Sequence, residues 1–259
     1  MDLELKGRRV VVTGGSRGIG YAIALAFARE GALPLLVSRS AESLARAADA
    51  IRAETGVEAG TLAADLGSAD GVQSVCDAAA GCDILVNNAG AIPGGTIADV
   101  DDARLRHAWE LKLFGYISLV RSILPRMEQR GRGVIANVIG SAGAAPRAEF
   151  IAGSAANAAL MAFTQGVGGA SVRAGVRVFG INPSATRSDR METMLRSQAE
   201  KKFGSAERWK ELTTQMPFGR LMEPREVAEF TVFCCSPRAG YLSGEVINLD
   251  GGQRFASAK

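Results

Sequence analysis

A glycine-rich stretch near the amino terminus is the clearest candidate for a site that binds a ligand. The chain reads TGGSRGIG over residues 13–20, between a short apolar run and a segment of helical apolar spacing that begins at Ile19. Gly14 permits a tight turn, Gly18 lets the backbone approach a pyrophosphate, and Gly20 lets the helix pack close to its strand. Free N–H groups at the start of a helix attract anions. The stretch therefore predicts a loop that binds the phosphates of a dinucleotide.

The end of the second predicted strand bears on the choice of coenzyme. A site selective for NAD places a carboxylate there, which accepts a hydrogen bond from the ribose 2′-OH. This chain instead has Ser38 and Arg39 at the turn, and Arg17 lies in the glycine loop. Two guanidinium groups can hold a 2′-phosphate through paired, charge-assisted hydrogen bonds. We therefore favour NADP(H) over NAD; the alternative is that both arginines are ordinary surface residues.

These residues need a scaffold, and the pattern of the chain alternates between strand and helix from end to end. Short apolar, β-branched runs predict strands at Arg9–Thr13, Leu33–Val37, Val57–Ala63, Asp83–Val86, Val134–Val138, Val176–Ile181 and Glu245–Leu249. Helical spacing predicts helices at Ile19–Glu30, Ala41–Glu54, Ala69–Ala79, Leu105–Gln129 and Gly153–Val172, and a last one from Pro224. This order predicts an α/β fold, a Rossmann-like doubly wound parallel sheet of about seven strands with helices on both faces.

Length and composition point to one domain. The chain has 259 residues, of which 47% are hydrophobic and 22% charged, which fits a single α/β domain over residues 1–259. The formal net charge is +3 and the basic residues are scattered, which argues against nucleic acid as a partner. We find neither a secretory signal nor an apolar run of about 18 residues, so we expect a cytoplasmic protein without a membrane partner.

The cysteines and the lone histidine show no metal-binding pattern. The four cysteines lack CxxC spacing and His107 lies in a helical stretch, so we expect reduced thiols and no metal site. One further segment stands out because its pattern is weak. The polar residues 187–217 form either a flap on the substrate side or a solvated insertion.

Several motifs, taken together, resemble those of the short-chain dehydrogenase/reductase family over nearly the whole chain. TGGSRGIG is similar to the family's TGxxxGxG loop, and NNAG at residues 87–90 matches the motif that follows its fourth strand. The Pro-Ser pair at residues 183–184 resembles its Pro-Gly turn, with serine in place of glycine. Residues 65–66 lie where the family contacts adenine, and residues 219–230 and 243–252 resemble the family's ending.

The resemblance implies an oxidoreductase that binds a nicotinamide coenzyme and acts on a small-molecule substrate. It also implies a homo-dimer or homo-tetramer built partly from the two long helices. Together with the glycine loop and the two arginines, it gives the residues that we expect to contact the coenzyme: Gly14, Ser16, Arg17, Gly18, Ile19, Gly20, Arg39, Asp65, Leu66, Asn88, Ala89, Gly90, Asn157, Pro183, Thr186 and Ser188.

The chain departs from the family's catalytic residues, which are a Ser, a Tyr and a Lys in a YxxxK motif, and an Asn on the preceding long helix. No tyrosine of this chain has a lysine four positions later. Residues 158–160 resemble the family's KAAL segment, which places Asn157 at the Lys position and Gly153 at the Tyr position. A competing register places Phe150 and Ser154 there. Neither register supplies a phenol or an amine.

Two further positions also depart from the family. Gly140 lies at the Ser position, with Ser141 beside it, and Lys112 lies where the family has Asn. A positioned acid is worth roughly 10²–10⁴ in rate, so the missing phenol should impair ordinary ketone reduction. The amide of Asn157 can still hydrogen-bond the nicotinamide ribose, because it both donates and accepts.

Lys112 is our candidate for the missing proton donor. An amine lost at position 157 and gained at 112 can point into the same cavity, and a lysine in a closed apolar pocket has a lowered pKa. The alternative is a solvent-facing charge on an amphipathic helix. Tyr116, four residues on, either assists Lys112 or packs in the core or a subunit interface. Ser141 is a second candidate donor, or it merely stabilises a turn. The catalytic candidates are Lys112, Ser141 and Asn157.

Three functions are compatible with these residues. The leading hypothesis is an NADP(H)-dependent oxidoreductase with an atypical proton donor, acting for example on an enone or an imine. The second is a non-redox lyase, aldolase or isomerase on the same scaffold, and the third is a non-catalytic nucleotide-binding protein. The intact phosphate loop favours the first and the third, whereas the missing Tyr and Lys favour the second and the third.

Overall fold

The computed structural model describes residues 1–255 and confirms the predicted sheet. Seven parallel strands lie in the order β3-β2-β1-β4-β5-β6-β7. They are β1 Arg9–Thr13, β2 Leu33–Ser38, β3 Gly60–Ala63, β4 Ile84–Asn87, β5 Gly133–Val138, β6 Val176–Pro183 and β7 Val246–Leu249. The strand order reverses between β1 and β4. The loops that leave these two strands therefore diverge and open a crevice at their carboxyl ends.

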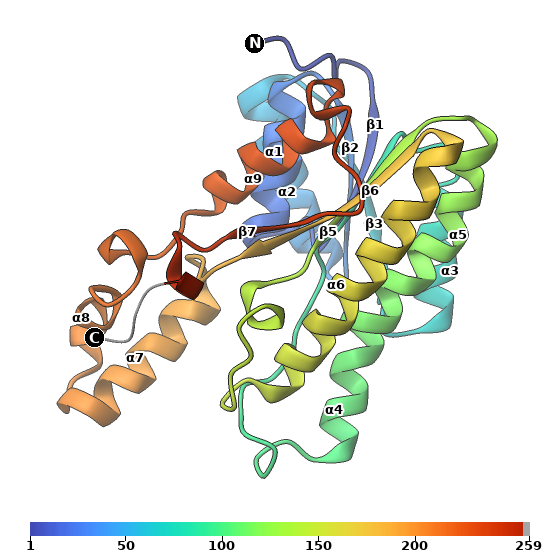
Figure 1. The fold of residues 1–259 in the computed structure, drawn as a ribbon. Coiled ribbons are helices and arrows are strands. Elements are labelled where there is room, and N and C mark those ends of the chain that lie inside the picture. The colour runs from blue at the N-terminus through green and yellow to red at the C-terminus, as the bar shows by residue number, and fades with distance from the viewer. Residues whose placement is uncertain (256–259) are drawn as a thin grey trace.

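Helices cover both faces of the sheet (Figure 1). One face carries α1 Gly18–Arg29, α2 Ala41–Thr55 and α9 Pro224–Cys235, and the other carries α3 Ala69–Ala78, α5 Gly115–Gln129 and α6 Ile151–Ser171. Side chains alternate along β1, so that Val10 and Val12 share an apolar cluster with Phe27 of α1. Val11 belongs instead to the cluster of Leu119 in α5. The apolar runs of the sequence thus mark strands that are buried on both faces.

Local interactions fix the ends of several helices. Ser40 caps the start of α2 through its hydroxyl, and Gly56 ends this helix with a φ of +72°. Glu223 and Glu226 form a capping box at the start of α9, where Pro224 occupies the first helical position. The predicted start of the last helix at Pro224 is confirmed.

The long helix predicted over Leu105–Gln129 is interrupted, so that prediction is wrong in its middle. α4 (Asp102–Trp109) and α5 are joined by a π-helical turn over Glu110–Phe114, in which Gly115 N bonds to the carbonyl five residues back. Gly115 lies against the loop after β3, where an added Cβ would come 3.3 Å from Leu66 O. One wider turn shifts the helical period by a single residue, so the sequence pattern does not reveal it.

Among the other elements, two predicted starts differ by two residues or more, and β6 ends at Pro183 rather than at Ile181. β3 begins at Gly60 rather than at Val57, because only residues 60–63 pair with β2 at the edge of the sheet. α6 begins at Ile151, two residues before the predicted Gly153. Gly153 therefore lies inside the first turn of α6. The apolar pattern of the sequence does not indicate that this helix begins at Ile151.

The segment predicted as a flap, residues 187–217, contains two helices beyond the carboxyl ends of β6 and β7 (Figure 1). α7 spans Asp189–Phe203 and α8 spans Trp209–Thr213. Leu195 of α7 and Trp209 of α8 are buried in a small apolar cluster of their own, apart from the clusters of the sheet. The segment is thus a packed unit, and its role on the substrate side remains a prediction.

Within residues 1–255, no helix combines the length and the apolarity that a membrane crossing needs. Nor do three or more His, Cys, Asp or Glu side chains come together there in a group that could hold a metal ion. The four cysteines are buried and free, and burial raises the pKa of the Cys82 and Cys234 thiols to about 11. Thiols with so little thiolate are poor nucleophiles at neutral pH.

Two neighbouring glycines of α6 test how closely this helix packs on the sheet. An added Cβ on Gly168 would overlap the Val178 carbonyl of β6 and lie 2.5 Å from Gly244 N, whereas one on Gly166 meets nothing within 4 Å. Gly168→Ala should therefore lower the free energy of unfolding by about 1–3 kcal/mol, as overpacked cores do. Gly166→Ala should raise it by roughly 0.8–1 kcal/mol, because alanine is the better helix former.

Urea unfolding of both variants, followed by far-UV circular dichroism, measures the two effects. Equal changes of the same sign would show that helix propensity, and not contact with β6, decides the outcome.

Candidate functional site

The loops that leave β1 and β4 are tied together at the point where the strand order reverses. Thr13 Oγ1 accepts hydrogen bonds from Asn88 N at 2.9 Å and from Ala89 N at 3.1 Å. In return, Asn88 Nδ2 donates to Thr13 O at 3.0 Å. Ligands of open α/β sheets bind in this crevice. Asn88 and Ala89, two of the predicted coenzyme residues, thus help to build the crevice.

The glycine loop is packed on one side and open on the other. An added Cβ on Gly14, whose φ is +67°, would lie 2.8 Å from Asn88 Nδ2, and one on Gly20 would overlap the Gly14 carbonyl. Gly18, with a φ of +57°, has nothing within 4 Å of its Cβ position. Arg17 makes no side-chain cap at the start of α1. The first N–H groups of α1 therefore remain available to an anion.

The end of β2 supplies the groups expected to recognise a 2′-phosphate. Gly15 N donates to Val37 O at 3.1 Å, which holds the glycine loop against the end of β2. Ser38 Oγ is buried and has no hydrogen-bond partner in the described part of the chain. Arg17 and Arg39 are exposed, and neither takes part in an ion pair within residues 1–255. One unpaired hydroxyl and two unpaired guanidinium groups fit a phosphate.

Five of the remaining predicted coenzyme residues lie in or next to three loops: the glycine loop and the loops after β3 and β4. Asp65 Oδ1 accepts from Gly67 N at 2.9 Å, so this carboxylate stabilises its own turn, and Leu66 is buried behind it. Ser16 and Ile19 are half-buried in the glycine loop. Gly90 follows Ala89 in the loop after β4.

The loop after β6 holds the last three predicted residues. Pro183 ends β6, Thr186 is buried and donates its hydroxyl proton to Ser184 O at 2.9 Å, and Ser188 caps α7. The hydroxyls of Thr186 and Ser188 therefore already have partners in the protein. Their backbone groups follow the carboxyl end of β6, at the same edge of the sheet as the crevice.

Gly140 and Asn157 meet at the carboxyl end of β5. Asn157 is buried, and its Nδ2 donates to Gly140 O at 3.4 Å. A Cβ on Gly140, whose φ is +131°, would come 2.9 Å from that Nδ2 atom, so the glycine leaves room for the amide. Asn157 Oδ1 is buried without a hydrogen-bond partner among the described residues. A buried acceptor of this kind fits a ligand hydroxyl.

The sequence analysis missed a set of buried asparagines that supports this site. Asn87 Nδ2 donates to Asn137 Oδ1 at 2.9 Å, and Asn137 Nδ2 donates to Thr164 Oγ1 of α6 at 2.9 Å. Asn182 Oδ1 accepts from Gly140 N at 3.2 Å. The available signal is that β4, β5 and β6 each carry an asparagine close to their carboxyl ends.

Neither register for the missing tyrosine places a hydroxyl at the site. The ring of Phe150 lies where a side chain on Gly153 would begin, with its Cδ1 atom 2.6 Å from the Cβ position. Ser154 Oγ accepts from Arg147 N at 3.0 Å and is buried. A phenylalanine ring therefore fills the space beside position 153, and the hydroxyl at 154 is engaged locally.

Ser141 begins a 3₁₀ turn, Ser141–Gly143, directly after Gly140. Its carbonyl accepts from Ala144 N and Ala145 N at 3.0 Å each, which stabilises the turn. Its hydroxyl is half-exposed and makes no hydrogen bond to another residue of the described chain. The backbone thus accounts for the turn, and the hydroxyl is left over as a possible donor.

Lys112 is buried, so the alternative of a solvent-facing charge is wrong. Its Nζ donates to Val138 O at 2.8 Å and to Tyr116 Oη at 3.0 Å, and Tyr116 Oη donates to Val138 O at 3.0 Å. Tyr116 is completely buried, which places it in the core. An ammonium has three N–H donors. The third one has no acceptor within residues 1–255.

The surroundings of Lys112 change its acidity. Burial lowers the pKa of its amine to about 7, and no carboxylate pairs with it in the described chain. The side chain runs past Gly90, where an added Cβ would come 2.9 Å from Lys112 Cδ and 3.5 Å from Nζ. The amine thus lies between the end of β5 and the loop after β4, and this loop is one of the two that border the crevice.

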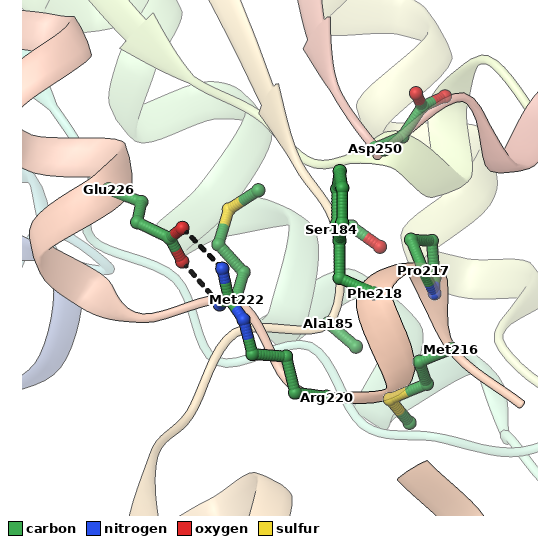
Figure 2. A pocket seen from close by; sticks show the side chains of 10 residues that line it. Ser184, Ala185, Met216, Pro217, Phe218, Arg220, Met222, Glu226 and Asp250 are labelled. Atoms are coloured by element: carbon green, nitrogen blue, oxygen red, sulfur yellow. Dashed lines mark hydrogen bonds and ion pairs between the residues drawn. The ribbon is translucent and has the colours of Figure 1, made fainter. Parts of the chain in front are cut away.

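A separate hollow lies at the ends of β6 and β7 (Figure 2). It is lined by Ser184, Ala185, Met216, Pro217, Phe218, Arg220, Met222, Glu226, Asp250 and Gly251. Figure 2 shows Arg220 paired with both oxygens of Glu226, each at 2.7 Å, which lowers the pKa of that carboxyl to about 2. None of the catalytic candidates lines this hollow.

An open parallel sheet with a glycine loop at its point of reversal defines a dinucleotide-binding protein of the Rossmann-like class. The chain belongs to the short chain dehydrogenase family, whose model matches residues 8–199. Its curated relatives include the 7alpha-hydroxysteroid dehydrogenase of Escherichia coli (strain K12), which is 29% identical over 255 residues. That alignment covers 97% of this chain and 96% of the relative.

Solved structures agree with this assignment. The L-sorbose reductase of Gluconobacter frateurii, complexed with NADPH and L-sorbose, superimposes with a TM-score of 0.92 at 32% identity, covering 99% of this chain and 100% of that chain. A 7 alpha-hydroxysteroid dehydrogenase complexed with NADH and 7-oxo glycochenodeoxycholic acid has a TM-score of 0.86 at 28% identity, covering 97% and 96%. The chain is therefore an oxidoreductase of the short-chain type by family.

The buried amine predicts a pH dependence of stability. The pKa of Lys112, about 7 in the folded chain, lies below its ordinary value of 10.5. Between these values the unfolded chain binds a proton that the folded chain does not, so raising the pH favours folding. Relative to Lys112→Met, the wild type should gain up to about 1.4 kcal/mol in free energy of unfolding per pH unit from pH 7 to pH 9.

Urea unfolding of both proteins at intervals of one pH unit checks this slope. All other ionisable groups are the same in both proteins, so their contributions cancel in the difference. Parallel curves for the two proteins would mean that the amine keeps its ordinary pKa.

Proposed function

We propose that this protein is an NADP(H)-dependent oxidoreductase in which the buried amine of Lys112 replaces the family's tyrosine as proton donor. The observation that carries the proposal is the position of that amine. It lies beside the crevice, between Gly90 and Val138, and within residues 1–255 it has one donor left over and no carboxylate partner. An amine with a pKa near the working pH can both hold and release a proton.

The residues of the crevice fit NADP(H). The open backbone at Gly18 and the start of α1 would hold the pyrophosphate, and Ser38, Arg17 and Arg39 would hold the 2′-phosphate. When bound, the coenzyme supplies or accepts a hydride at its nicotinamide ring. The NADPH of the L-sorbose reductase structure supports this choice, and the NADH of the hydroxysteroid dehydrogenase shows that relatives differ in coenzyme. The unpaired arginines favour NADP(H) here.

Asn157 would orient the nicotinamide ribose. Its Oδ1 is a buried acceptor without a partner, so a ribose hydroxyl that donates to it removes an unfavourable unpaired group. A lysine at this position could only donate. The change from lysine to asparagine therefore reverses the direction of the hydrogen bond and leaves the site without its usual positive charge.

Lys112 would then supply that charge from the neighbouring helix. In the reducing direction, the oxygen of a substrate carbonyl gains negative charge, and the third N–H of Lys112 is free to stabilise it and to protonate it. Solvent returns the proton to the amine afterwards. The hydroxyl of Ser141, which begins the turn after Gly140, is a second donor to the same oxygen.

The expected partners are a small-molecule substrate and further copies of this chain, in a homo-dimer or homo-tetramer in the cytoplasm. The surface of α4 supports self-association. A hollow on α4 and the following π-helical turn is lined by the apolar residues Leu105, Trp109 and Phe114 together with Asp102, Arg106 and Glu110, and Phe114 is 47% exposed. Exposed large apolar side chains are a feature of contact sites between proteins.

A second candidate function is that of a nucleotide-binding protein without catalysis. The observation in its favour is the ring of Phe150, which fills the space beside Gly153 with an apolar group. A non-catalytic nucleotide-binding protein would use the whole phosphate loop and would need no proton donor. A lyase or isomerase on the same scaffold has no comparable observation in its favour.

Arg39 tests the coenzyme. Arg39→Ala should weaken binding of NADPH about 10- to 100-fold, because a hydrogen bond to a charged group is worth about 1.5–3 kcal/mol. Binding of NADH, which lacks the 2′-phosphate, should change by less than about twofold. Fluorescence titration of each reduced coenzyme measures both constants, with Arg46→Ala, an exposed arginine of α2 paired with Glu42, as the control. An equal loss for both coenzymes would contradict the role of Arg39.

Lys112 tests the proton donor. Lys112→Ala should lower the turnover of a panel of ketones, enones and imines by about 10²–10⁴, as the loss of a general acid does. Loss of absorbance at the NADPH maximum measures turnover, and Lys202→Ala, an exposed lysine of α7, is the control. Unchanged turnover together with unchanged NADPH affinity would rule out Lys112. NADPH binding by the wild type without turnover of any compound would favour the non-catalytic candidate.

A further inference from the structure

Two cations flank the loop after β4 from opposite elements. Lys112, in the π-helical turn, lies against Gly90. Arg190, in the first turn of α7, donates from Nη2 to the carbonyl of Ile92, two residues further on. Lys112 therefore comes from the helices that pack on the sheet, and Arg190 comes from residues 187–217. Both side chains contact the loop that follows β4.

Arg190 differs from the other arginines of this segment in having no carboxylate partner. Residues 187–217 contain four arginines. Arg187 pairs with Glu223 at 2.8 Å, Arg196 pairs with two glutamates, and Arg208 pairs with Glu211 at 2.6 Å. Within residues 1–255, Arg190 forms no ion pair, and its only hydrogen bond goes to a backbone carbonyl. Four of its five N–H donors are therefore free.

Two acids of the surrounding loops, Asp99 and Glu149, form no ion pair with either cation within residues 1–255. Asp99 accepts from both the backbone N and the hydroxyl of Thr96, at 2.8 and 2.7 Å, which lowers the pKa of its carboxyl. Glu149 is exposed and pairs with no cation in the described chain. Within residues 1–255, neither Lys112 nor Arg190 forms an ion pair with a carboxylate.

We propose that the substrate carries a carboxylate, which the guanidinium of Arg190 binds while Lys112 faces the reacting oxygen. The proposal rests on the proposed function and adds the substrate class: an oxo acid, or the corresponding hydroxy acid in the reverse direction. A guanidinium matches a carboxylate through two parallel N–H···O bonds, which gives both affinity and orientation. The carboxylate is a binding group only and leaves the reaction unchanged.

The contact with Ile92 explains how α7 is placed for this task. The apolar cluster of the segment, with Leu195 and Trp209, is separate from the core of the sheet. The bond from Arg190 to the Ile92 carbonyl therefore ties α7 to the loop after β4. One N–H of Arg190 bonds to Ile92 and holds α7 in place, and the other N–H groups of Arg190 remain available to an anion beside the loop.

Binding of unreactive probes tests the proposal without turnover. The full chain is titrated by calorimetry with oxamate, which carries a carboxylate, and with oxamide, its neutral counterpart. We expect binding of oxamate and at least tenfold weaker binding of oxamide. Arg190→Gln should weaken oxamate about tenfold or more, as expected for a hydrogen bond to a charged group, and should leave oxamide unchanged. Arg190→Lys keeps the charge without the paired donors and should give an intermediate loss.

The control variant is Arg196→Gln, which removes an arginine of α7 that is already paired with Glu192 and Glu207. It should bind oxamate like the wild type. Equal affinity for oxamate and oxamide, no binding of either, or full oxamate affinity in Arg190→Gln with an unchanged unfolding temperature would each overturn the proposal.

Turnover separates this inference from the proposed function. The wild type is assayed with NADPH and 2-oxo acids of increasing chain length, each beside its primary amide. A kcat/KM at least about tenfold higher for the acids, lost in Arg190→Gln, supports the inference. Equal kcat/KM for acids and amides overturns it and leaves the proposed function standing. No turnover of acids, amides or other carbonyl compounds removes the proposed function, and the oxamate titration then decides on the anion site alone.

Discussion

The site depends on the hydrogen bonds between Thr13 and Asn88, which join the two central strands where the strand order reverses. The hydroxyl of Thr13 accepts two backbone N–H groups from the loop after β4, and Asn88 returns a bond to the Thr13 carbonyl. Gly14 and Gly20 must lack side chains because Asn88 occupies that space. This packing fixes the side of the glycine loop that faces Asn88. The other side of the loop, at Gly18, is left open for a ligand.

The carboxyl edge of the sheet continues this arrangement through buried amides. Asn87, Asn137 and Thr164 link β4, β5 and α6, while Asn182 of β6 holds the backbone of Gly140. Buried polar groups of this kind are stable only when they are paired, which makes the edge rigid. Asn87 Oδ1 and Asn157 Oδ1, which are buried without a hydrogen-bond partner in the described chain, are exceptions to that rule. Unpaired buried groups are expected at sites that receive a ligand.

The predicted exchange of amine and amide between positions 112 and 157 would change what the site can do. The sequence analysis predicts that Asn157 lies at the family's lysine position and Lys112 at its asparagine position, and Lys112 is buried beside Tyr116. A buried ammonium without a counter-ion is costly, which lowers the pKa of Lys112 to about 7. A protein that retains such a group gives up stability at neutral and acidic pH. A bound anion, or the negative charge that develops on a substrate oxygen, would act as the counter-ion of Lys112 and offset this loss of stability.

The sequence by itself determined the order of strands and helices, because apolar periods of two kinds and glycine-marked turns are local properties of the chain. It also predicts a phosphate loop and the loss of the family's Tyr and Lys, since both predictions depend on residue type and spacing. Only the tertiary structure decided that Lys112 is buried on Val138, that Phe150 covers Gly153, and that Arg190 reaches Ile92. The contacts of Lys112 and Arg190 join residues of different elements, whereas Phe150 flanks the first turn of the helix that contains Gly153. The π-helical turn that carries Lys112 changes the direction of its side chain, and no periodic pattern of the sequence records this change.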